Sequence, residues 1–183
     1  MSEPRSGAFL SDIQTLRQRA REHIAQGAVT PGYHADRSVV LKLLNEALAT
    51  EIICTLRYKR HYFSAKGIHA ESVAAEFLEH AQDEQQHADQ IAERITQLGG
   101  EPDFSPDGLM SRSHAEYVEG EDLESMIRED LVAERIAIDS YREMVAYLGD
   151  ADPTTRRLME EILAKEEEHA DDLANLLEDL GKH

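Results

Sequence analysis

The sequence is poor in residues that interrupt helices or cross-link chains. It has only 10 glycines and 5 prolines in 183 residues, which leaves room for long helices. Its single cysteine, Cys54, excludes a framework of disulfides within the chain and fits a reducing compartment. No apolar run approaches the ~18 residues of a membrane span, and the start MSEPRSGAFL holds no apolar signal segment. We therefore expect a cytoplasmic chain with no membrane partner.

Basic residues are also in short supply. The 19 Lys and Arg stand against 37 Asp and Glu, so the formal net charge is −18. Proteins bind nucleic acids largely through Lys and Arg that neutralise phosphates and release counterions. The segment from Phe9 to Gln26 has the basic residues Arg17, Arg19 and Arg21, with Lys42 beyond it, and these are too few to offset this charge. The composition therefore predicts no nucleic-acid partner and favours metal cations instead.

Helical periodicity runs along most of the chain, and strand-like alternation is absent. A short amphipathic helix is predicted from about Phe9 to Gln26, followed by a linker to Arg37. Four long helices are predicted over about residues 37–66, 71–98, 121–148 and 153–180, with glycines just beyond their ends. We divide the chain into an N-terminal helix with linker, residues 1–36, and a helical bundle, residues 37–183.

The lengths of the connections predict how the long helices are arranged. Only a few residues join the first helix to the second and the third to the fourth, so each pair is expected to form an antiparallel hairpin. About twenty residues join the second helix to the third, enough to run the roughly 42 Å length of a 28-residue helix. The expected fold is all-α: a four-helix bundle with one long crossover and an extra N-terminal helix.

A glutamate interrupts the apolar stripe of each long helix near its middle. In the second long helix, Ala81 and Ala88 continue the stripe on either side of Glu84. The midpoints of helices of equal length meet at the same height, whichever way each helix runs. We therefore expect one layer of four carboxylates at the centre of the bundle: Glu51, Glu84, Glu134 and Glu166.

This layer needs a counter-charge, because an unpaired buried carboxylate is costly or takes up a proton. No Lys or Arg lies on the apolar stripes, so a cation is the simplest counter-charge. His87 and His169 follow Glu84 and Glu166 by three residues, on the same helix faces. Four carboxylates and two imidazoles suit two iron or manganese ions better than zinc. The predicted metal ligands and catalytic residues are Glu51, Glu84, His87, Glu134, Glu166 and His169.

A single Glu-x-x-His motif is a weak signal. With 23 glutamates and nine histidines, about one such pair is expected by chance, and two occur. The prediction rests on joint placement, since both pairs lie at helix centres, on apolar stripes, and level with a single glutamate in each of the other helices.

The constellation resembles that of the ferritin-like superfamily, in its bacterioferritin and Dps-like branch, over about residues 37–180. The local matches are Leu44-Asn45 leading to Glu51, the run Asp83-Glu84-x-x-His87-Ala88-Asp89, and Glu161-Ile162-Leu163 leading to Glu166-x-x-His169. The resemblance implies two Fe ions per subunit, with Mn as an alternative. By position, Glu51 and Glu134 resemble terminal ligands, Glu84 and Glu166 bridging ligands, and His87 and His169 terminal nitrogen ligands.

The resemblance also implies an activity. The chain is expected to be a ferroxidase that oxidises Fe(II) with O2 or H2O2 and stores the Fe(III) as mineral inside a homo-oligomeric cage. An acidic excess larger than a two-metal site requires is consistent with an inner wall that attracts iron.

Two departures from the bacterioferritin pattern refine this expectation. The methionine that binds haem in bacterioferritins directly follows the second-helix glutamate, and Gln85 stands there, so haem is not expected. The chain stops at Gly181-Lys182-His183 without the fifth helix that lines pores of 24-subunit cages, and it carries an N-terminal helix instead. A cage of twelve subunits is therefore favoured over one of twenty-four.

Several side chains near the predicted centre have two possible roles. Tyr58 and Tyr141 each lie seven residues after the single glutamate of their helix. Each is either a core tyrosine with a hydroxyl partner or a group that binds a ligand or supplies an electron during oxygen reduction. His80 is either a packed histidine or an additional ligand, and Cys54 is expected to be a small buried hydrophobe.

Two other functions stay open from the sequence. One is a rubrerythrin-like peroxidase or other di-metal oxidase without storage, which the paired tyrosines favour and the lack of a Cys-x-x-Cys module disfavours. The other is a structural bundle that uses bound metal only to hold its fold together.

Overall fold

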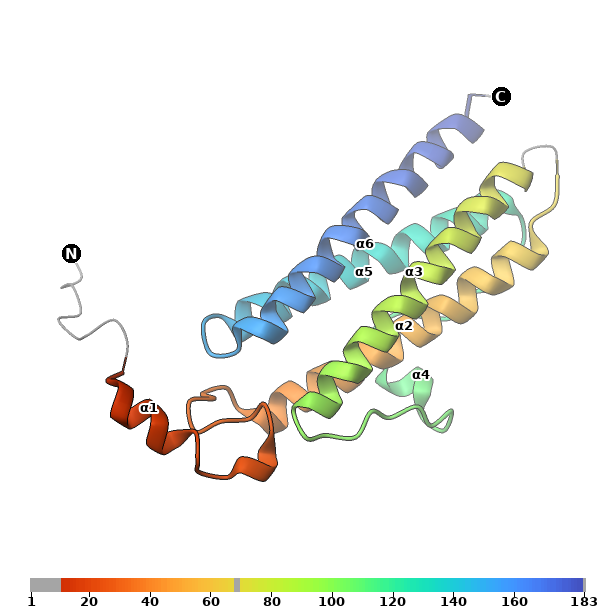
Figure 1. Cartoon of the computed structure of the whole chain (residues 1–183). Coiled ribbons are helices and arrows are strands. Elements are labelled where there is room, and N and C mark those ends of the chain that lie inside the picture. Colours follow the sequence, from red (N-terminus) through yellow and green to blue (C-terminus); the bar gives the residue numbers. More distant parts are fainter. Residues whose placement is uncertain (1–10, 68–69, 183) are drawn as a thin grey trace, which may run out of the picture.

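The four long helices predicted from the sequence form a bundle in the computed structural model, which describes residues 11–67 and 70–182. They are α2 (Arg37–Ser64), α3 (Ala70–Gln97), α5 (Leu123–Leu148) and α6 (Pro153–Leu180). Figure 1 shows two hairpins, α2 with α3 and α5 with α6, lying side by side. Over the described ranges every regular element is helical, so the predicted all-α bundle is confirmed. No helix there is long and apolar enough to cross a membrane.

The ends of the long helices follow local sequence signals. Asp36 caps α2 through the backbone N–H groups of Ser38 and Val39. Asp122 forms a capping box at the start of α5, and Asp152 with Pro153 starts α6. Gly149 ends α5 with a φ of 46°, a conformation that side chains disfavour. The predicted bounds of the long helices are therefore within two residues of those observed.

The predicted continuous helix from Phe9 to Gln26 is wrong where the structure describes it; Phe9 itself lies outside the described residues. Helix α1 covers only Ile13–Arg19, and a separate 3₁₀ turn, η1, covers Ile24–Gln26. His23 between them has a φ of 51°. No residue of either element is buried, so no tertiary packing extends helices this short. The division of the chain at residue 36 stays a prediction.

The crossover between α3 and α5 runs the length of the bundle along α2. The crossover contains a short helix, α4 (Leu109–Arg112), that the sequence did not predict. Polar side chains spaced along α2 form hydrogen bonds with successive backbone groups of the crossover. The pairs are Asn45 with Asp103, Thr50 with His114, Arg57 with Glu116, and His61 with Val118. The crossover therefore joins opposite ends of the bundle, as predicted.

A buried charge cluster joins α2, α5 and the crossover. Asp130 is fully buried and accepts a hydrogen bond from Arg57 Nε at 2.8 Å, while its other oxygen lies 2.8 Å from His61 Nδ1. Arg57 and His61 also reach the carbonyl oxygens of the crossover. A single carboxylate thus fixes the register between two helices and the segment that connects the hairpins.

The two largest apolar clusters of the core lie at different heights along the bundle. One cluster, at the end where α2 begins, includes Leu44, Ile95 and Ile162. The other includes Phe77 and Leu173 and lies towards the opposite end. Between them lies the polar layer that the interrupted stripes predict.

Removing the Asp130 carboxylate is expected to destabilise the fold strongly. Asp130→Ala leaves Arg57 and His61 buried without their partner, at a cost of about 3–5 kcal/mol in the free energy of unfolding. Asp139→Ala is the matched control on the same helix, because its side chain is 81% exposed. Its effect should stay within about 0.5 kcal/mol. Urea unfolding measures both; equal losses would contradict the anchoring role.

Candidate metal centre

The six side chains predicted as metal ligands come together in the layer between the two apolar clusters. Each belongs to a helix whose apolar stripe faces the bundle axis, so each is carried inward by the packing of that stripe. All are buried: the four glutamates and His169 are 1% exposed, and His87 is 6% exposed. The structure thus places together the complete set Glu51, Glu84, His87, Glu134, Glu166 and His169.

These side chains form two overlapping groups. The first is Glu51, Glu84, His87 and Glu166, and the second is Glu84, Glu134, Glu166 and His169. Within each group, one potential ligand atom per residue lies within 4.8 Å of all the others. Glu84 and Glu166 belong to both groups. The geometry therefore suits two adjacent ions with two carboxylates between them; that these residues bind metal stays a prediction.

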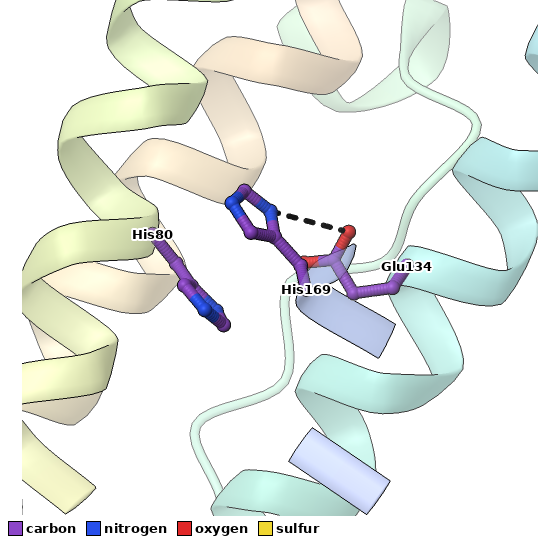
Figure 2. Close-up of side chains that lie close together, drawn as sticks. All are labelled: His80, Glu134 and His169. Carbon is purple, nitrogen blue, oxygen red and sulfur yellow. Dashed lines mark ion pairs between the residues drawn. The ribbon is translucent and has the colours of Figure 1, made fainter. Parts of the chain in front are cut away.

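Each histidine points one ring nitrogen at the carboxylates of its group. His87 Nδ1 lies 3.1 Å from Glu166 Oε1 and 3.3 Å from Glu51 Oε2. His169 Nδ1 lies 3.5 Å from Glu166 Oε2, 3.7 Å from Glu84 Oε1 and 4.0 Å from Glu134 Oε2. Figure 2 shows His169 turned towards Glu134, with His80 beside it. Both imidazoles therefore add a nitrogen to a set of oxygens.

The buried polar atoms of this centre lack the partners that a folded protein normally supplies. Six of them are buried without a hydrogen bond: Glu51 Oε2, Glu84 Oε1, His87 Nδ1, both oxygens of Glu166, and His169 Nδ1. Such groups are costly unless something else satisfies them. A cation in each group would satisfy all six at once. The donor set, oxygen-rich with one imidazole per group, fits iron or manganese.

Two buried arginines could have supplied the counter-charge, but both are engaged elsewhere. Arg57 binds Asp130, and Arg94 lies 3.0 Å from Asp152 at the start of α6. Within the described part of the chain, no Lys or Arg forms an ion pair with any of the four glutamates. No Lys or Arg therefore neutralises this layer in the described chain, as the apolar stripes predict.

Protons are the alternative counter-charge. Burial, followed by repulsion from Glu84, raises the pKa of Glu51 to about 8, and burial raises the pKa of Glu134. Burial disfavours a charged His169, but Glu166 and Glu84 outweigh it and raise the pKa of His169 to about 10. The pKa of His87 is raised for the same reason. Metal binding here would release protons, since the ligands must be deprotonated.

The two tyrosines each bind a glutamate of the centre. Tyr58 donates a hydrogen bond to Glu134 Oε1, and Tyr141 donates one to Glu51 Oε1. Both rings are buried, and burial raises the pKa of each hydroxyl well above its usual value, so both remain protonated donors. The expectation of a core tyrosine with a hydroxyl partner is confirmed, and that partner is a predicted ligand.

Two further side chains reach the centre. Asp83 Oδ2 lies 3.1 Å from His169 Nε2, the contact that usually orients a metal-binding histidine. The His80 ring stacks on the His169 ring at 4.0 Å between centroids (Figure 2). His80 could be noticed from the sequence because it lies one turn before Glu84. The contact between Asp83 and His169 could not be predicted, because it joins two different helices. Cys54 is buried, as expected.

Comparison with known protein families gives one match over most of the chain. A family model described as the ferritin-like domain matches residues 41–182. A nutrient stress-induced DNA-binding protein of Nostoc sp. is 36% identical over 151 residues, 78% of this chain and 80% of that protein. The net charge led to the expectation that the chain has no nucleic-acid partner. The similarity to a protein named as DNA-binding does not fit this expectation, and we drop it.

Bacterioferritins are similar to the chain in sequence and in structure. One from Desulfovibrio desulfuricans is 29% identical over 154 residues, 83% of this chain and 80% of that protein. The structure of a bacterioferritin from that species, described for its diiron site, has a TM-score of 0.71 and covers 80% and 82% of the two chains at 26% identity. A dodecameric thioferritin from Bacteroides fragilis has a TM-score of 0.79 at 32% identity, covering 81% and 90%.

Divalent metal is expected to stabilise the folded chain through the two groups. Mn(II) at 100 times its Kd should raise the free energy of unfolding by about 2.7 kcal/mol per site, and EDTA should reverse the change. Glu84→Ala removes a carboxylate from both groups and should abolish most of the shift. Glu93→Ala, an exposed glutamate on the same helix, should keep it. Thermal melts with and without metal measure the shift; the same shift in both variants would contradict this assignment.

Proposed function

Because the chain belongs to the ferritin-like superfamily, in its bacterioferritin and Dps-like branch, we propose that it is a ferroxidase that also stores iron. It binds two Fe(II) ions, passes their electrons to O2 or H2O2, and retains the Fe(III) as mineral inside a homo-oligomeric cage. The observation that carries the proposal is the pair of overlapping groups, buried and unsatisfied, that share Glu84 and Glu166.

The proposed roles follow from the two groups. Glu51 and His87 hold one ion, Glu134 and His169 hold the other, and Glu84 and Glu166 lie between both. Iron supplies the redox chemistry, and manganese fits the same donors. The protein keeps the site dry and negatively charged, and it holds the ligands in place before the ions arrive. Asp83 fixes the ring of His169 by binding its other nitrogen.

The tyrosines are proposed to orient the two glutamates that belong to a single group each. Tyr141 binds Glu51 Oε1, which leaves Oε2 facing His87 at 3.3 Å. Tyr58 binds Glu134 Oε1, which leaves Oε2 facing His169. Each hydroxyl thus occupies one carboxylate oxygen and presents the other to the metal position. Their place beside the centre also supports a role as electron donors during oxygen reduction.

Iron oxidation by the metal-free protein is the direct test of this activity. Fe(II) added aerobically should produce ferric absorbance faster than in buffer alone. Glu84→Ala should bring the rate down to that of buffer, because both groups lose a shared ligand, whereas Glu93→Ala should leave it unchanged. If wild type is no faster than buffer, or if Glu84→Ala oxidises iron as fast as wild type, the proposal fails.

The cage is supported by a relative and by an exposed apolar surface. The Bacteroides fragilis protein, 32% identical to this chain, is described as dodecameric. In the single chain, the α1 side chains of Ile13 and Leu16 are 58% and 44% exposed, so α1 is a candidate for packing against another subunit. We propose twelve subunits over twenty-four for these reasons.

Native mass spectrometry measures the assembly. The expected species has twelve times the 20.6 kDa mass of one chain. A dimer would refute the cage, because two chains cannot enclose a mineral, and a 24-subunit species would refute the smaller assembly only.

A rubrerythrin-like peroxidase or other di-metal oxidase without storage is the second candidate. The hydrogen bonds from both tyrosines to ligands of the centre favour it, since they place two oxidisable side chains beside the metals. Iron retention distinguishes the two functions. A storage protein keeps many Fe(III) ions per assembly after gel filtration, whereas an oxidase keeps only those in its centre.

A further inference from the structure

His80 lies between the candidate metal centre and the protein surface. It is 2% exposed, and on its inner side it stacks on His169 (Figure 2). Its Nε2 lies 3.9 Å from Glu76 Oε2 and 3.9 Å from Asp172 Oδ2. These distances exceed those of a hydrogen bond, so the nitrogen faces two carboxylates without binding either.

The tautomer of His80 follows from its other nitrogen. Nδ1 lies 3.3 Å from the hydroxyl oxygen of Tyr58, and the proton of that hydroxyl is already donated to Glu134. Nδ1 must therefore carry a proton and donate to the tyrosine oxygen. A neutral imidazole has one ring proton, so Nε2 then carries none. The free lone pair is then on Nε2, which is directed at Glu76 and Asp172.

The two carboxylates are held near each other without a cation between them. Glu76 is on α3 and Asp172 on α6, and their side chains are 39% and 45% exposed. Burial and then repulsion from Asp172 raise the pKa of Glu76. Among the described residues, neither carboxylate forms an ion pair with any group other than His80. Both therefore remain open to a ligand from solvent.

Glu76, His80 and Asp172 have the spacing of a divalent-metal site. One ligand atom from each lies within 4.8 Å of the other two. Two ligands at about 2.1 Å from a tetrahedral ion lie about 3.4 Å apart, so small side-chain rotations close the site. The next group inward, His80, Glu134 and His169, also has ligand atoms within 4.8 Å of one another. Potential ligands thus continue from the surface to the buried centre.

We propose that Glu76, His80 and Asp172 form a third, outer divalent-metal site, and that Fe(II) reaches the buried centre through it. The outer site itself depends only on these three side chains. Its role in delivering Fe(II) rests on the proposed ferroxidase function. The metal stays divalent throughout this transfer, so no oxidant is needed.

Metal stoichiometry tests the outer site without using the oxidation chemistry. Anaerobic titration of the metal-free protein with Co(II), followed by calorimetry, should give three ions per chain in wild type and two in Glu76→Gln/Asp172→Asn. The matched control is Glu79→Gln/Asp171→Asn, which removes the same charge from adjacent exposed residues on the same two helices. It should still bind three ions. Two ions in wild type, or three in the first double variant, would overturn the proposal.

Iron oxidation at limiting Fe(II) tests the route. The initial rate of Glu76→Gln/Asp172→Asn should be about 10-fold lower than that of wild type, which is the lower end of the usual effect of removing groups that support a metal site. The rate of Glu79→Gln/Asp171→Asn should equal that of wild type. Equal rates in the two double variants would refute entry by this route. If wild type oxidises no iron, the ferroxidase proposal fails, and the Co(II) titration still decides whether the outer site exists.

Discussion

The architecture depends on four carboxylates held in a dry layer, where they repel one another and cannot be hydrated. Apolar packing above and below the layer forces them together, and the two buried arginines are bound to other acids. Apolar packing therefore offsets the cost of burying these carboxylates, whose charge only cations or protons can neutralise. The contacts around the layer reflect this constraint, since each of the two histidines and each of the two tyrosine hydroxyls contacts at least one of the four glutamates.

Much of this could be predicted from the sequence because helical phase is a strong signal. Glu84 interrupts an apolar stripe that neighbouring residues define on both sides, so its inward direction needed no knowledge of the other helices. The equal lengths of the four helices then fixed its height. Helical phase cannot give which glutamates would lie between two ions; the family resemblance supplied that expectation.

Contacts between helices were beyond the sequence. The apolar stripe of α5 can be traced through Ile127 and Leu131 without Asp130, so the sequence gives no reason to expect this carboxylate to be buried. In the structure it is fully buried because it binds Arg57 and His61. The N-terminal helix was overestimated for the opposite reason. Its local pattern is amphipathic, but none of the described residues of α1 is buried in the single chain, and α1 covers only seven residues.

Anomalous X-ray diffraction from crystals soaked in Mn(II) can test directly whether the carboxylate layer binds two ions, because it locates each ion without relying on activity. Two strong peaks about 3.5–4 Å apart are expected in the buried layer, both within ligand distance of Glu84 and Glu166. One peak in this layer, or two that do not share these carboxylates, would contradict this expectation.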